Sequence, residues 1–146
     1  MAMERDLSIE TPDSSGGRPL ALVLGRHEDT RSMMRAMLEA WGFEVEELVT
    51  SDGVASKVAD TPSLVMMDAS LPFQESLDTA TELKSCPKLR DVPILMMSGF
   101  AQADYRDAAV ERGITDYLVK PVDFDALQKF VVELARLNDR KGGAIV

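Results

Sequence analysis

The sequence is poor in the residues that build disulfides and zinc sites. Its 146 residues include one cysteine and one histidine. A lone cysteine excludes an internal disulfide, so Cys86 is expected to be a free core thiol in a reducing compartment. His27 has no second histidine or cysteine near it in the sequence, which argues against a zinc site.

Positive charge and long apolar runs are also scarce. Lysine and arginine number 16 against 25 acidic residues, and the net charge is −9. This balance argues against a nucleic-acid-binding surface and against an anionic membrane surface. No apolar run approaches the ~20 residues of a membrane span, and the first residues contain no apolar stretch typical of a signal peptide. We therefore expect a cytoplasmic protein without nucleic-acid or membrane partners.

What the sequence does contain is a regular alternation of short apolar runs with amphipathic segments. Residues 1–18 predict a flexible leader, 19–138 a single domain, and 139–146 a flexible tail. Apolar runs without polar alternation are typical of strands that are covered on both faces. Strands are predicted at Leu20–Leu24, Phe43–Val49, Ser63–Met67, Val92–Met97 and Asp116–Val119.

Helices are predicted between these strands and after the last one. The first has a cap at Asp29 or Thr30 and ends at Gly42, and a weaker second helix begins at Ser51 or Asp52. The third carries Leu77, Ala80 and Leu83, the fourth spans Ala101–Arg112, and the fifth follows a cap at Asp123. Alternating strands and helices indicate an α/β fold with a doubly wound parallel five-stranded sheet.

Three polar residues stand at or just past the ends of predicted strands: Asp68, Ser98 and Lys120. In a parallel sheet these ends meet at one edge, where ligands bind. A carboxylate there can attack phosphorus and become an acyl phosphate, while a hydroxyl and an ammonium hold the phosphoryl oxygens. The alternative is that polar residues simply mark the ends of strands.

Three segments resemble the receiver domain of bacterial response regulators: "LVMMDASLP", "VPILMMSG" and "GITDYLVKP". The resemblance covers roughly residues 19–138. It implies a CheY-like, flavodoxin-like (βα)5 fold with strand order 2-1-3-4-5. It also implies that Asp68 is the phosphoacceptor, that Ser98 binds the phosphoryl group and that Lys120 pairs with it. Tyr117 matches an aromatic switch residue, although an ordinary half-buried tyrosine is an equal alternative, and the Lys120–Pro121 bond matches one that is usually cis.

The sequence departs from this family directly after the first strand. The family has an acidic pair there that binds Mg²⁺, and the matching positions are Gly25 and Arg26. Mg²⁺ requires anionic oxygens, and an arginine repels it. Only Asp68 and the backbone carbonyl of Ser70 remain as ligands, so Mg²⁺ binding is not expected. No other cofactor is expected.

Three roles are open for Arg26. Its guanidinium can occupy the metal position and pair with Asp68, or it can clamp a phosphoryl group directly. In the third alternative, Glu28 and Asp29 replace the missing acids, which requires the first helix to start later. The family also often has glycine where this chain has Ser76, so the loop 73–76 is expected to differ in shape.

The resemblance predicts a two-component signalling receiver rather than an enzyme, with at most self-catalysed phosphoryl transfer at Asp68. Its partners would be a sensor histidine kinase or phosphotransfer protein. A downstream protein, or a second copy of the chain, would contact the face of the fourth helix, fifth strand and fifth helix. The alternative is a pseudo-receiver, a binding module that is not phosphorylated. A haloacid-dehalogenase-type phosphatase is disfavoured because Ser70 stands where its second acid would be, and a flavodoxin because "GRHEDT" is a poor phosphate loop.

Overall fold

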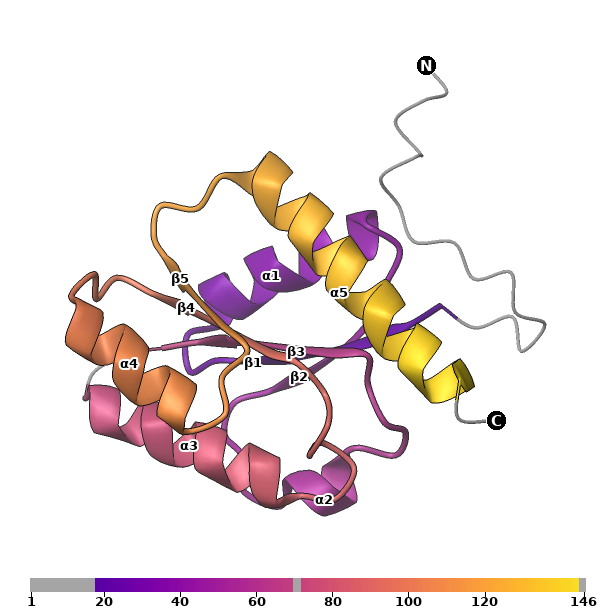
Figure 1. Cartoon of the computed structure of the whole chain (residues 1–146), viewed down its shortest axis with the longest axis horizontal. Coiled ribbons are helices and arrows are strands. Elements are labelled where there is room, and N and C mark those ends of the chain that lie inside the picture. The colour runs from indigo at the N-terminus through magenta and orange to yellow at the C-terminus, as the bar shows by residue number, and fades with distance from the viewer. Residues whose placement is uncertain (1–17, 70–71, 145–146) are drawn as a thin grey trace.

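A five-stranded parallel sheet forms the centre of the protein (Figure 1). The computed structural model describes residues 18–69 and 72–144. The strand order is β2-β1-β3-β4-β5, and every pair of neighbouring strands is parallel, which confirms the predicted fold class. The strands are β1 Leu20–Leu24, β2 Glu44–Leu48, β3 Leu64–Asp68, β4 Ile94–Ser98 and β5 Asp116–Val119.

Helices cover both faces of the sheet (Figure 1). On one face lie α1 (Glu28–Ala40) and α5 (Phe124–Ala144), and on the other lie α2 (Val54–Lys57), α3 (Phe73–Ser85) and α4 (Ala103–Glu111). Alternate residues of β1 point to opposite faces. Ala21 and Val23 therefore join the core under α1 and α5, while Leu22 and Leu24 join the core under α3. The two central strands β3 and β4 are buried along their whole length, as their continuous apolar runs predict.

Two of the predicted helix starts are wrong. Helix α1 begins at Glu28 after His27, which is earlier than the expected cap at Asp29 or Thr30. The acidic side chains Glu28 and Asp29 occupy its first turn, where the helix dipole favours negative charge. Helix α2 begins at Val54 rather than near Ser51, because Gly53 adopts a left-handed backbone with φ 67°.

At the other helices, one expected cap is confirmed and two expected boundaries differ. Asp123 caps α5, since its Oδ1 accepts hydrogen bonds from the backbone N–H groups of Asp125 and Ala126. The segment 73–76, expected to be a loop, is instead the first turn of α3, and Ser76 is buried in it. Helix α5 continues to Ala144, beyond the domain boundary expected at residue 138. Most of the expected leader lies outside the described residues.

Among the described residues, none of the helices is both long enough and apolar enough to cross a bilayer. Cys86 is a free, buried thiol, as the sequence predicts.

Candidate functional site

The sheet register brings the three predicted strand-end residues to one edge. Asp68 is the last residue of β3 and pairs in register with Met97 of β4, while Ser98 pairs with Val119 of β5. The backbone N–H of Lys120 then donates to the carbonyl of Ser98 at 2.8 Å. These contacts bring Asp68, Ser98 and Lys120 together at the carboxyl edge, where ligands of such sheets bind.

Asp68 and Lys120 form a close ion pair. The Lys120 ammonium donates to Oδ1 of Asp68 at 2.6 Å. The Asp68 side chain is only 4% exposed, whereas that of Lys120 is 39% exposed. The carboxylate is therefore withdrawn from water but has a cation on one oxygen, while the ammonium still reaches solvent. The Lys120–Pro121 peptide bond is cis, as the resemblance implied.

Ser98 bonds to Tyr117 and Phe100. Its Oγ accepts a hydrogen bond from the backbone N–H of Phe100 at 2.9 Å and lies 2.9 Å from the Tyr117 hydroxyl. That hydroxyl also lies 2.7 Å from the carbonyl oxygen of Phe100. A carbonyl only accepts, so the Tyr117 proton goes to Phe100 and the Ser98 hydroxyl donates to the Tyr117 oxygen. Ser98 thus has its hydrogen committed to Tyr117.

The side chain of Tyr117 points into the core and is 1% exposed, so it is more deeply buried than the half-buried strand tyrosine that the sequence allowed. Phe73 of α3 packs against it edge-on with ring centroids 6.3 Å apart, and the Arg106 guanidinium lies 5.5 Å from the Tyr117 ring centre. Phe73 also contacts Phe100 and Tyr105. This aromatic cluster holds the Tyr117 ring from the α3 and α4 side.

Gly25 and Arg26 lie directly after β1, beside Asp68. A Cβ at Gly25 would lie 3.4 Å from Cβ of Asp68, so the turn passes next to the carboxylate residue. Arg31 holds the backbone of this turn, because its Nη1 donates to the carbonyl of Gly25 at 2.9 Å and its Nε pairs with Glu47 at 3.1 Å. The turn is therefore positioned by side chains of α1 and β2.

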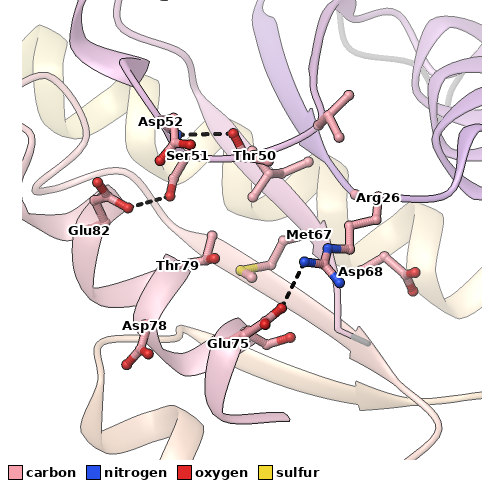
Figure 2. A pocket seen from close by; sticks show the side chains of 14 residues that line it. Arg26, Thr50, Ser51, Asp52, Met67, Asp68, Glu75, Asp78, Thr79 and Glu82 are labelled. Carbon is pink, nitrogen blue, oxygen red and sulfur yellow. Dashed lines mark hydrogen bonds and ion pairs between the residues drawn. The ribbon is translucent and has the colours of Figure 1, made fainter. Parts of the chain in front are cut away.

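The Arg26 side chain pairs with Glu75 rather than with Asp68. Its Nη2 lies 2.9 Å from Oε1 of Glu75, in the first turn of α3. Figure 2 shows the guanidinium directed at Glu75, on the side away from the Asp68 carboxylate. The first role open for Arg26, an ion pair with Asp68, is therefore not the arrangement in the structure. The third is also contradicted, because α1 starts earlier rather than later.

A cavity of about 270 Å³ separates these groups from the loop after β2. Asp68, Arg26 and Glu75 line it, together with hydroxyl and acidic side chains (Figure 2). On its far side Ser51 donates to Glu82 at 2.5 Å. Acidic side chains outnumber cationic ones around this cavity, and Arg26 is the single cation among its described lining residues.

The positions that match the family's acidic pair offer no carboxylate to a magnesium ion. Gly25 has no side-chain ligand, Arg26 contributes a cation, and Asp68 already pairs with Lys120. Within 18–69 and 72–144, no cluster of three or more histidine, cysteine, aspartate or glutamate residues could hold a metal ion. Ser70, the other ligand implied by the resemblance, lies outside the described residues. A hard divalent cation prefers anionic oxygens, and among the described residues Asp68 is the one remaining ligand that the resemblance implied.

Sequence reasoning missed Glu75, Phe73 and the carbonyl of Phe100. Glu75 follows Pro72 by three residues, but no spacing in the sequence connects it with Arg26. No spacing in the sequence connects Phe73 with Phe100 either, although their ring centroids lie 5.3 Å apart.

Comparison with known proteins identifies the fold and the sequence family of these residues. The model of the response regulator receiver domain matches residues 22–132. The transcriptional regulatory protein ZraR of Salmonella typhimurium is 30% identical over 114 residues, covering 77% of this chain and 25% of ZraR. PrrA of Mycobacterium tuberculosis, also a transcriptional regulatory protein, is 28% identical over 131 residues, covering 89% of this chain and 54% of PrrA. The chain thus spans between a quarter and about half the length of these relatives.

Solved structures agree on the fold. The chemotaxis response regulator CheY4 of Vibrio cholerae superimposes with a TM-score of 0.69 at 19% identity, covering 80% of this chain and 98% of CheY4. The receiver domain of the sensor histidine kinase PA1611 from Pseudomonas aeruginosa gives 0.69 at 21% identity, covering 82% and 98% of the two chains. That receiver was solved with a magnesium ion in its active-site cleft.

Proposed function

This chain belongs to the response regulator receiver family, and we propose that it accepts a phosphoryl group on Asp68 and signals through protein contacts. The observation that carries the proposal is the position of Asp68. It ends β3, pairs through Oδ1 with Lys120 at 2.6 Å, and borders a cavity of about 270 Å³. A carboxylate with a cation beside it is suited to attack phosphorus, because the cation offsets the charge that gathers on the phosphoryl oxygens.

The proposed reaction is a simple displacement at phosphorus. A carboxylate oxygen of Asp68 attacks the phosphorus of the donor and forms an acyl phosphate. With acetyl phosphate, the bond between phosphorus and the bridging oxygen breaks and acetate leaves with the electron pair. With a phosphohistidine donor, the phosphorus–nitrogen bond breaks and the imidazole leaves. Lys120 stays beside the new phosphoryl group and stabilises its charge.

The proposed donor is a sensor histidine kinase or a phosphotransfer protein, since these present phosphohistidine to receivers of this family. The proposed output surface is formed by α4, β5 and α5, through which a downstream protein or a second copy of the chain would bind. The inward Tyr117 connects β5 with the end of β4 at this surface, which supports the choice.

A second candidate function is that of a pseudo-receiver, which binds partners without phosphorylation. The observation in its favour is that Ser98 is already bonded to Tyr117 and to the backbone of Phe100. To bond a phosphoryl oxygen, its hydroxyl must leave Tyr117. The absence of acidic side chains at Gly25 and Arg26 points in the same direction.

Incubation with acetyl phosphate separates the two candidates. The chain and its Asp68→Asn variant are treated with acetyl phosphate, with Mg²⁺ or with EDTA, and intact masses are recorded. A phosphate adduct in the wild type that Asp68→Asn abolishes supports the phosphoacceptor. If neither acetyl phosphate nor a panel of phosphorylated histidine donors yields an adduct in any condition, the pseudo-receiver replaces it.

A further inference from the structure

Arg26 and Glu75 form an ion pair in the lining of the cavity that Asp68 also borders. Arg26 comes from the turn after β1 and Glu75 from the first turn of α3, and Nη2 and Oε1 lie 2.9 Å apart (Figure 2). Both line the same cavity as Asp68. The pair is open to water, since the two side chains are 53% and 54% exposed.

The backbone of the turn at Arg26 is held by Arg31, whereas the Arg26 side chain is half exposed. Arg31 Nη1 donates to the carbonyl of Gly25 at 2.9 Å, and at 3.4 Å it also reaches the carbonyl of Arg26. Because this turn passes beside Asp68, the Arg26 side chain begins close to that residue, as an exchange of partners from Glu75 to a group bound there requires. An exposed ion pair contributes little to stability, so the exchange costs little.

A phosphoryl group is a stronger partner for Arg26 than Glu75 is. It carries close to two negative charges and three acceptor oxygens, and a guanidinium binds such groups with two parallel hydrogen bonds. Gly25 and Arg26 replace the acidic pair of the family, so the cationic side chains Arg26 and Lys120 are available to balance the phosphoryl charge.

We propose that Arg26 is a second built-in cation of this site, in addition to Lys120, and that Glu75 is its exchangeable counter-ion. When a phosphoryl group occupies the position beside Asp68, Arg26 leaves Glu75 and pairs with the phosphoryl oxygens without a divalent cation. Glu75 therefore competes with phosphate and lowers the affinity of the site. The inference rests on the proposed phosphoacceptor role of Asp68 for its biological use, but the anion exchange itself is tested separately.

The first test measures binding of inorganic phosphate in EDTA by NMR, using the Nε–Hε signal of Arg26. The background is Asp68→Asn, so that a carboxylate does not oppose the anion. Glu75→Gln is expected to lower the dissociation constant about two- to fivefold, because a competing carboxylate is removed. Arg26→Gln, followed by backbone amide signals, is expected to raise it about tenfold, because a charged hydrogen-bond donor is lost.

The exchange also predicts coupling between the two residues. In the Arg26→Gln background, Glu75→Gln should no longer change the affinity, since Glu75 acts through Arg26. Glu39→Gln is the matched control: it removes an exposed carboxylate that pairs with Arg35 at 3.0 Å and does not line the cavity. Circular dichroism verifies that every variant is folded. Equal phosphate affinities for the parent, Glu75→Gln and Arg26→Gln would overturn the exchange.

The second test follows adduct formation with acetyl phosphate in EDTA, using proteins that retain Asp68. Glu75→Gln is expected to accelerate it about two- to fivefold and Arg26→Gln to slow it about tenfold. Unchanged rates in both variants would overturn the role of Arg26 while leaving Asp68 as phosphoacceptor. If no protein forms an adduct, the phosphoacceptor proposal fails, and the phosphate titration still decides whether Arg26 exchanges partners.

Discussion

The hydroxyl of Tyr117 lies 2.9 Å from Oγ of Ser98, and both side chains are buried. This contact joins the edge strand β5 to the end of β4. The side-chain hydroxyl at the end of β4 belongs to Ser98, and it bonds to Tyr117 rather than to Asp68. The tyrosine and the serine are therefore one unit, and a change in one is expected to affect the other.

Replacement of Tyr117 by phenylalanine removes this hydroxyl and leaves the carbonyl of Phe100 without its side-chain donor. We expect the free energy of unfolding to fall by about 1–2 kcal/mol, because a buried hydrogen-bonded pair is broken. Urea denaturation measures the change. Tyr105→Phe is the control, since the Tyr105 hydroxyl makes no hydrogen bond with any of the described residues. Equal effects of the two substitutions would show that the buried hydroxyl contributes nothing.

Lys120→Gln leaves the buried carboxylate of Asp68 without its cation. We expect a loss of about 1–3 kcal/mol at pH 7, less than for a fully buried pair because Lys120 is partly exposed. In the Asp68→Asn background the same substitution should cost much less, because no buried charge remains. Chemical denaturation of the four proteins measures this coupling. The exposed Lys129→Gln serves as the neutral control, and an undiminished loss beside Asn at position 68 would contradict the ion-pair explanation.

Glu47 makes stability depend on pH in the acidic range. A hydrogen bond from Arg35 lowers the pKa of the Glu47 carboxyl below its ordinary value of 4.5, with a further contribution from Arg31, although burial opposes the shift. A carboxyl with a lowered pKa stabilises the fold above its unfolded value, and this stabilisation is lost as the pH falls through the folded value. We expect Glu47→Gln to lose about 0.5–1 kcal/mol at pH 7.

The same substitution should matter progressively less below pH 4.5, where the wild-type carboxylate also becomes protonated. Denaturant midpoints of the wild type and of Glu47→Gln, recorded from pH 7 to pH 3, measure the difference. Glu46→Gln, beside it in β2, is the control because no ion pair of Glu46 occurs in the described part of the chain. A constant difference across this range would refute the assignment.

Phe73 supports Tyr117 through the aromatic cluster. Phe73→Ala is expected to cost about 3 kcal/mol, because it removes a buried ring and its edge-on contacts with Phe100 and Tyr105. Phe124→Ala, at a position that is 52% exposed, should change stability by less than about 0.5 kcal/mol. Thermal unfolding compares the two, and near-ultraviolet circular dichroism reports whether the tyrosine environment changes. Similar costs for both would show that the cluster adds no stability.

The sequence by itself determined the fold of this protein, because the fold depends on patterns that repeat along the chain. Continuous apolar runs such as those in β3 and β4 are typical of a parallel sheet that is covered on both faces, because there the side chains on both sides of a strand are buried. The same patterns predicted that Asp68, Ser98 and Lys120 meet at one edge, since strand ends of a parallel sheet share that edge. Helix starts were less predictable, as α1 and α2 show, because several neighbouring residues can act as caps.

The tertiary structure alone decided which partners these side chains choose. Arg26 has a long side chain on a turn, and its position in the sequence allows Asp68, a phosphoryl group or a distant carboxylate as partner. Its pairing with Glu75 depends on where the first turn of α3 lies relative to the turn after β1. The bond between Ser98 and Tyr117 depends in the same way on the rings packed around it. Such pairs depend on distances between residues that are far apart in the chain. Local sequence patterns carry no information about these distances.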